Sequence, residues 1–193
     1  TPLFGGSTAN IIDKIGPGTL LWTGTNTTIA KLRASAGTFA IGGSGALSAN
    51  GTTSQAIDIL TGATFRYGSS GNQTLSGAIT CGGTFEKSGA GLLVINGALA
   101  LNAGGELALP AVPATNDAVR INALALNGGT FRITNLAQLH PGVTYTVFTS
   151  DNTLPSGILS MVTGLPASWR ISLSSTSKAV QLYKPLGSLL LIN

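Results

Sequence analysis

The chain has 193 residues, of which 43% are apolar and only 8% are charged. Globular domains usually carry about 25% charged residues, but this apolar content suffices to bury a core, so the composition excludes an intrinsically disordered chain. The net charge is +4, and the ten basic residues are scattered singly. Because a nucleic-acid surface needs a concentrated stripe of Lys and Arg, we predict no nucleic-acid partner.

Residues 1–10 are predicted to form an N-terminal leader that precedes the repetitive part of the chain. The leader begins with Thr1 rather than with a methionine, and an apolar pair, Leu3 and Phe4, precedes two glycines. No signal peptide is recognisable, and no apolar run reaches the roughly eighteen residues that a membrane span needs. We interpret the chain as a mature, processed product or an excised fragment, with no membrane span.

Residues 11–135 are built from an internal repeat of about 20–26 residues. Residues 98–109 and 123–133 both read apolar-x-apolar, then Asn and a Gly turn, then apolar-x-apolar, with an offset of 24 to 25 between the two copies. Apolar positions 57, 59, 65 and 67 map onto 99, 101, 107 and 109 at a constant offset of 42, which is about two units. Residues 32–41 form a further copy.

A second pattern recurs at a longer interval. Residues 14–24 align with residues 87–97 at an offset of 73, near three units, and an acidic residue precedes the lysine in both segments. The lysines are Lys14 and Lys87, and the acids are Asp13 and Glu86. We therefore expect the two segments to occupy equivalent places in their coils.

The repeat predicts the fold class. Alternation with period two places one set of side chains on one face of a strand, and strands this short cannot bury that face alone. Stacking successive coils buries it and pairs the backbone groups of each coil with its neighbours. Gly and Asn at the corners permit the turns between faces. We predict one all-β domain, a right-handed parallel β-helix (β-solenoid), with a sandwich of long strands as the alternative.

Residues 83–97 resemble the autotransporter-associated β-strand repeat of bacterial surface and secreted proteins. They follow its pattern of Gly-Thr-apolar-x-Lys-x-Gly-x-Gly, an apolar alternation and a final Gly, with Leu92 where Thr is usual. Residues 139–148, 160–166 and 179–182 resemble the closing region of such passengers. The resemblance implies a β-helix located outside the cell or on its surface.

Residues for catalysis are sparse. The only histidine, His140, precedes Pro141–Gly142 in an expected turn, and no Gly-x-Ser-x-Gly elbow occurs. Asp58 and Glu106 would be neighbours only if two strands aligned, and Glu86 is expected to pair with a Lys across coils. We therefore predict a protein that is not an enzyme and has no catalytic residues. An enzyme acting on polysaccharide, which would need paired carboxylates, is the remote alternative.

Metal and cofactor sites are also not expected. The single cysteine, Cys81, lies among small residues and is predicted to be a buried apolar side chain. There is no His/Cys cluster for zinc and no Gly-Gly-x-Gly-x-Asp repeat for calcium. The glycine-rich turn at residues 42–45 lacks the Lys and the helix of a phosphate loop.

The aromatic residues fall into two groups. Four phenylalanines recur at matching places in their units and predict a stacked ladder in the core: Phe39, Phe65, Phe85 and Phe131. Trp22 and Trp169 are less constrained by the repeat. Because an exposed tryptophan can stack on a sugar ring, we take these two as candidate glycan contacts.

The end of the chain departs from the repeat. Residues 136–183 predict a less regular cap region, and residues 184–193 an apolar terminal strand. This strand either folds back onto its own domain or adds to the sheet of a neighbouring subunit. The candidate subunit-interface residues lie at both ends of the chain: Leu3, Phe4, Leu186, Leu189, Leu190, Leu191 and Ile192.

Two functions are compatible with these features. The first is a non-enzymatic structural subunit of an extracellular filament or surface coat, which assembles head to tail into a homopolymer through its terminal strands. The alternative is a passenger or stalk module of an adhesin, with cell-surface or matrix glycans as partners.

Overall fold

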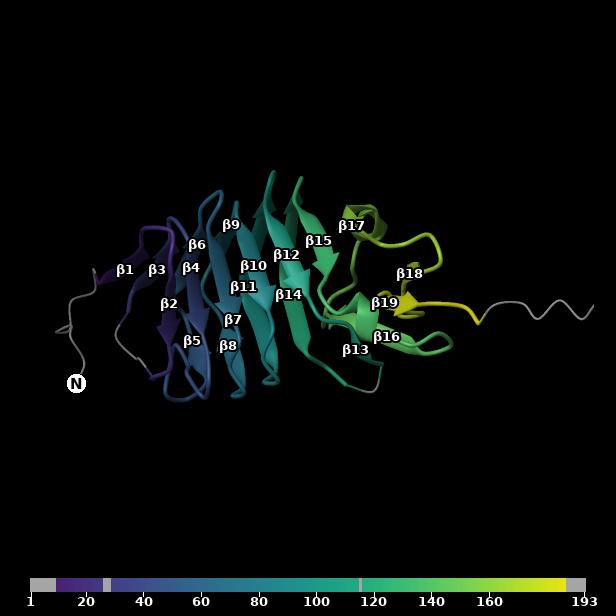
Figure 1. Cartoon of the computed structure of the whole chain (residues 1–193), viewed down its shortest axis with the longest axis horizontal. Helices are drawn as coiled ribbons and strands as arrows, with labels where there is room; N and C mark the ends of the chain where they lie inside the picture. The colour runs from purple at the N-terminus through teal and green to yellow at the C-terminus, as the bar shows by residue number, and fades with distance from the viewer. Residues whose placement is uncertain (1–9, 26–28, 115, 187–193) are drawn as a thin grey trace, which may run out of the picture.

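The computed structural model describes residues 10–25, 29–114 and 116–186. These form a parallel β-solenoid whose coils follow one another along the longest axis of the molecule, as Figure 1 shows from β1 to β15. Each complete coil crosses three faces of the solenoid, and like strands of successive coils pair in parallel. The fold class expected from the repeat is therefore confirmed.

The first face holds one strand from each coil. Its members are β1 (Ile11–Lys14), β3 (Lys31–Ala34), β6 (Ala56–Ile59), β9 (Ile79–Cys81) and the later parts of β11 (Leu93–Asn102) and β14 (Val119–Asn127). One aligned row across these strands consists of Ile12, Leu32, Ile57, Ile79, Leu99 and Leu124. The spacing of these residues along the sequence is uneven, so the coil length varies while the pairing register is kept.

The second face forms a sheet of its own. It contains β2 (Thr19–Trp22), β4 (Thr38–Ile41), β7 (Thr64–Tyr67), β10 (Thr84–Lys87), β12 (Glu106–Leu109), β15 (Thr130–Ile133) and β17 (Val162–Thr163). The third face is shorter and contains β5 (Thr52–Thr53), β8 (Gln73–Leu75) and the first parts of β11 and β14. Because β11 and β14 run continuously around a corner, they join the first and third faces into one sheet.

The interior is a column of apolar side chains. Phe39, Phe65 and Phe85 occupy aligned positions on β4, β7 and β10, with ring centroids 5.9 Å and 5.1 Å apart. Leu107 takes the next place, and Phe131 the one after it. All five side chains are buried, which confirms the predicted core ladder with a leucine inserted in it.

The longer repeat, which aligned Lys14 with Lys87, does not mark equivalent places, so that expectation was wrong. Lys14 lies on the first face, aligned with Ala34, whereas Lys87 lies on the second face, aligned with Tyr67. What the two segments share is a local turn, in which a strand-end lysine donates a hydrogen bond to the carbonyl two residues later. The same turn is used at two different corners.

The solenoid ends in a region of different topology. This region comprises β13 (Val112–Pro113), the short 3-10 segments η1 (Leu136–Gln138) and η2 (Ser156–Met161), and the antiparallel strands β16 (Thr144–Thr149), β18 (Arg170–Leu173) and β19 (Ala179–Tyr183). In Figure 1 it lies beyond β14 and β15, at the end opposite to β1. No helix in the described ranges is long and apolar enough to cross a membrane.

Candidate functional site

The first coil presents an open edge. Within the described part of the chain, β1 pairs only with β3 and β2 pairs only with β4, so their outer edges have unpaired backbone groups. Four large apolar side chains of this coil are exposed: Ile11 (54%), Ile15 (72%), Leu20 (39%) and Leu21 (60%). Unpaired strand edges beside exposed apolar side chains favour pairing with another strand.

Trp22 closes the core at this same end. It is half-buried, and its ring stacks on Phe39 with centroids 6.4 Å apart. Its indole Nε1 is buried and has no hydrogen-bond partner among the described residues. Trp22 therefore serves as the terminal member of the aromatic ladder.

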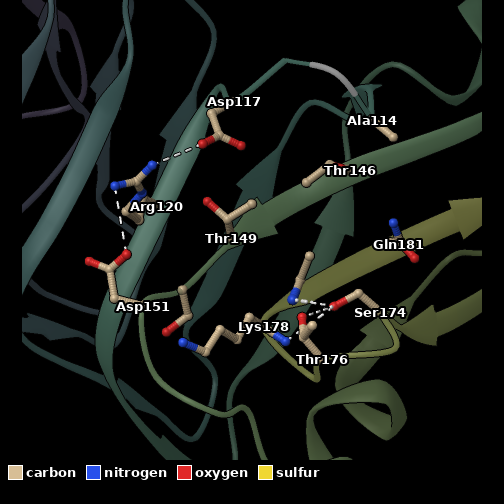
Figure 2. A pocket seen from close by; sticks show the side chains of 12 residues that line it. Ala114, Asp117, Arg120, Thr146, Thr149, Asp151, Ser174, Thr176, Lys178 and Gln181 are labelled. Carbon is tan, nitrogen blue, oxygen red and sulfur yellow. Dashed lines mark hydrogen bonds and ion pairs between the residues drawn. The ribbon is translucent and has the colours of Figure 1, made fainter.

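A polar hollow lies at the other end, where the last coil meets the antiparallel strands. It has a volume of about 350 Å³, and its walls come from β14, β16, β19 and the turn that joins β18 to β19. Figure 2 shows Arg120 between Asp117 and Asp151 on one side, with Lys178 and Gln181 from the other elements. The Arg120 guanidinium lies 3.1 Å from Asp117 Oδ2 and 3.7 Å from Asp151 Oδ1.

Each of the six Asp and Glu side chains of the sequence is paired with a basic side chain. Between coils of the first face, Lys31 lies 2.5 Å from Asp58, and Arg33 lies within 3.9 Å of both Asp13 and Asp58. Such exposed ion pairs each contribute only about 0–1 kcal/mol. Their arrangement leaves no acidic side chain of the chain without a cation.

The carboxylates of the second face are paired with arginines and lie on a different sheet from those of the first face. Glu106 makes a bidentate pair with Arg132 at 2.9–3.1 Å, and Glu86 lies 3.1 Å from Arg66. The expected cross-coil partner of Glu86 is thus an arginine rather than a lysine. Asp58 and Glu106 lie on different sheets, and the paired carboxylates of a glycosidase are not assembled from these two residues.

Two lysines are buried in the solenoid without a carboxylate among the described residues. Lys87 is fully buried, donates a hydrogen bond to the carbonyl of Gly89 and lies 5.6 Å from the centroid of the Tyr67 ring. Burial lowers the pKa of Lys87 from 10.5 to about 8, because desolvation disfavours the charged amine. Lys14 donates to three carbonyls, those of Ile15, Gly16 and Ala36.

The remaining reactive side chains lie apart. Cys81 is a free, buried thiol, as predicted, and burial raises its pKa to about 11. His140 is exposed in a turn, also as predicted, and its backbone N–H donates to the Tyr145 hydroxyl. Across the described ranges, no group of three His, Cys, Asp or Glu side chains is placed to hold a metal ion.

Trp169 is not an exposed platform, which corrects its selection as a glycan contact. Only 7% of it is exposed, and its ring lies 6.4 Å from that of Tyr145, with the Lys184 ammonium 5.9 Å from the ring centroid. Burial follows from the packing of the antiparallel strands, which the repeat does not encode. Trp22 ends β2 and Trp169 directly precedes β18. These two strands lie at opposite ends of the molecule in Figure 1, so the two tryptophans do not form one site.

The candidate interface residues are only partly placed. Leu3, Phe4, Leu189, Leu190, Leu191 and Ile192 lie outside the described residues. Leu186 is described and is 70% exposed. The apolar side chains of the first coil were not selected from the sequence, because their exposure depends on which coil comes first in the stack.

No family model matches the chain, and neither a curated protein nor a solved structure matches it.

Proposed function

We propose that this chain is a non-enzymatic structural subunit of an extracellular filament or cell-surface coat, in which copies associate head to tail through their terminal strands. The observation that supports this proposal is the open first coil. A solenoid buries each coil between two neighbours, and terminal coils of monomeric solenoids have polar outer faces. The first coil instead exposes Ile11, Ile15, Leu20 and Leu21.

The proposed contact is strand addition to the outer edge of β1 or β2. An added strand would satisfy the unpaired backbone groups of that edge and cover the apolar side chains beside it. The proposed donor is the apolar segment 186–193 of the next copy, whose sequence is Leu-Gly-Ser-Leu-Leu-Leu-Ile-Asn. Because the acceptor and donor are different surfaces, the contact is head to tail, and repeated without ring closure it produces an open filament.

Two variants test this contact. Leu21→Lys places a charge on the acceptor edge, and deletion of residues 187–193 removes most of the donor. Covering one leucine side chain contributes about 1.5–3 kcal/mol to the free energy of association. We therefore expect each change to raise the concentration needed for assembly by about tenfold or more. Sedimentation velocity and electron microscopy over a concentration series would measure this.

The matched control is Leu60→Lys. Leu60 is 46% exposed in the middle of the solenoid, away from both ends, so this variant changes the same residue type without touching the proposed edge. It should assemble like the unmodified protein. Single short rods of unmodified protein at every concentration, or assembly that neither end variant impairs, would contradict the proposal.

The passenger or stalk module of an adhesin is the second candidate function. It is favoured by the polar hollow between the last coil and the antiparallel strands, which combines side chains that donate and accept hydrogen bonds. The two functions are compatible, since the strands that line the hollow lie at the opposite end of the molecule from β1 and β2 of the first coil (Figure 1).

A further inference from the structure

We propose that the polar hollow between β14, β16 and β19 binds a segment of a neutral carbohydrate chain. This deepens the adhesin function proposed above and does not depend on filament assembly. Three properties of the hollow support it: its charge, its hydrogen-bonding groups and how firmly they are held.

The charges of the hollow select against an ionic ligand. Its wall contains two carboxylates, Asp117 and Asp151, and two cations, Arg120 and Lys178. Arg120 is already engaged by both carboxylates. An anion such as phosphate would meet the two carboxylates, and a metal cation would meet Arg120 and Lys178. The balance of charge therefore favours a neutral ligand.

The remaining groups suit a ligand rich in hydroxyls. Thr146, Thr149 and Gln181 line the hollow. Of the lining residues that the structure describes, Ala114 and Ala179 are the apolar ones, so an apolar ligand would gain little. A sugar hydroxyl both donates and accepts a hydrogen bond. It can donate to a carboxylate of one wall and accept from the Lys178 ammonium of another.

One group in the hollow has an unmet hydrogen bond. The Thr149 hydroxyl oxygen is buried and has no partner among the described residues. Because this oxygen is buried, a change of rotamer about the Cα–Cβ bond is needed before it can meet a ligand. Burying a hydroxyl without a partner costs about 1–3 kcal/mol, so a ligand that satisfies it would recover part of that energy.

The wall is held in place by hydrogen bonds to Asn122, which does not line the hollow, and by hydrogen bonds within the turn between β18 and β19. Asp151 accepts a hydrogen bond from Asn122 Nδ2 at 2.9 Å, and its backbone N–H donates to the side-chain oxygen of Asn122. The turn that presents Lys178 is fixed by the Ser174 hydroxyl, which accepts from the backbone N–H groups of Lys178 and Ala179 at 3.2 and 3.1 Å. A preformed wall loses less entropy when it binds.

The size and chemistry of the hollow set the expected affinity. A volume of about 350 Å³ falls within the roughly 300–1,000 Å³ of small-molecule sites, so a short segment of a carbohydrate chain fits. Among the described residues that line the hollow, none has an aromatic ring to stack on a sugar. We therefore expect a dissociation constant on the order of 1 mM, equivalent to about −4 kcal/mol.

Isothermal titration calorimetry tests this with three neutral tetrasaccharides, namely cellotetraose, maltotetraose and mannotetraose. Tetragalacturonate and inorganic phosphate serve as charged comparisons. We expect at least one neutral sugar to bind, with slower amide hydrogen exchange confined to β14, β16, β19 and the turn between β18 and β19. Lys178→Met and Asp151→Ala should each weaken this binding by about tenfold, the effect of losing one hydrogen bond to a charged group.

The matched control is Arg132→Gln, which removes an exposed, ion-paired arginine on the second face, away from the hollow. It should bind the sugar unchanged. Three results would overturn the carbohydrate proposal: no binding of any neutral sugar at about ten times the expected dissociation constant, binding that both hollow variants retain in full, or preference for tetragalacturonate or phosphate. Filament assembly is measured separately, so failure here leaves that proposal standing.

Discussion

At the scale of single residues, the buried lysines are the least expected feature of an apolar interior. Lys87 has no carboxylate among the described residues to compensate its charge, and its ammonium is satisfied by the carbonyl of Gly89 and by the face of the Tyr67 ring. Burying an amine in this way costs folding free energy while it is charged and costs less once it is neutral. The stability of the protein should therefore respond to pH in the alkaline range.

The sign of this response follows from three groups. Between pH 8 and 10.5, the unfolded chain keeps a proton on Lys87 that the folded chain has released, so the free energy of unfolding rises with pH. Between pH 9 and about 11, the unfolded chain loses the Cys81 proton that the folded chain retains, which opposes the rise. Burial also raises the pKa of Tyr67, which adds to the opposition above pH 10.

We therefore predict that the free energy of unfolding increases from pH 8 to 9 and then levels off. Lys87→Met should remove the increase, and Cys81→Ala should let it continue to about pH 10. Urea unfolding at fixed ionic strength across this range would measure all three proteins. A free energy that falls from pH 8 to 9 in the unmodified protein would contradict the burial of a charged Lys87.

At the scale of strands and corners, the aromatic ladder and the glycine corners limit which side chains the stacked coils accept. Phe65 lies between Phe39 and Phe85 and is fully buried. At the corner between the third and first faces, Gly97 of β11 passes directly over Gly77 of the coil before it. The packed interior needs a large side chain at position 65, whereas the close approach of two backbones at the corner leaves no room for a side chain at position 97.

For the ladder, we predict that Phe65→Ala lowers the free energy of unfolding by roughly 3–5 kcal/mol, because it leaves a cavity between two rings. Phe65→Leu should cost only about 1–2 kcal/mol, since Leu107 fills the corresponding place of another coil. Urea unfolding of the two variants gives the comparison. Equal losses would mean that aromatic stacking, rather than filled volume, stabilises the column.

For the corner, we predict that Gly97→Ala is severely destabilising, by more than about 3 kcal/mol. A Cβ atom there would lie 1.9 Å from the carbonyl oxygen of Gly77, so the backbone itself would have to move. Gly18→Ala is the control, because a Cβ atom at Gly18 would meet nothing within 4 Å. Its stability should change by no more than about 0.5 kcal/mol in the same assay. Similar losses for both would refute the close approach.

The sequence patterns predicted the features that depend on the local alternation of apolar and polar residues. They failed for features that depend on how strands pair between coils. The offset that maps Ile57 onto Leu99 was correct, because it spans two coils and passes through Ile79 in the same aligned row. The longer offset was misleading, because Lys14 and Lys87 share a turn sequence but lie on different faces. The repeat does not predict the partner of Glu86, because that partner depends on strand register. It does not predict the burial of Trp169 either, because that burial comes from the packing of the antiparallel strands.

At the scale of the whole molecule, the two ends of the solenoid differ. Within the described residues, one end is a coil with exposed apolar side chains, and the other consists of antiparallel strands that contain the polar hollow. In a stack where each coil contacts only its neighbours, stability is approximately a sum of neighbour terms. The first coil, which has a described neighbour on one side only, should be the least stable part of the stack.

We predict that amide hydrogens of β1 and β2 exchange faster than those of β7 and β10 in the unassembled protein. Raising the protein concentration into the range of assembly should slow exchange in β1 and β2 selectively. Hydrogen-exchange mass spectrometry at two concentrations would measure both effects. Uniform exchange along the solenoid, or slowing that spares the first coil, would argue against this coil as the contact surface.

The unequal coil lengths have a consequence for how such a molecule can change over evolutionary time. The step from Leu32 to Ile57 is longer than the step from Ile12 to Leu32, yet the strands stay aligned, so the corners absorb the difference. A corner can thus accept an inserted peptide as a new surface loop while the column of buried side chains continues beneath it. The same tolerance would make these corners suitable places to graft foreign epitopes or enzymes at regular intervals along a rigid rod.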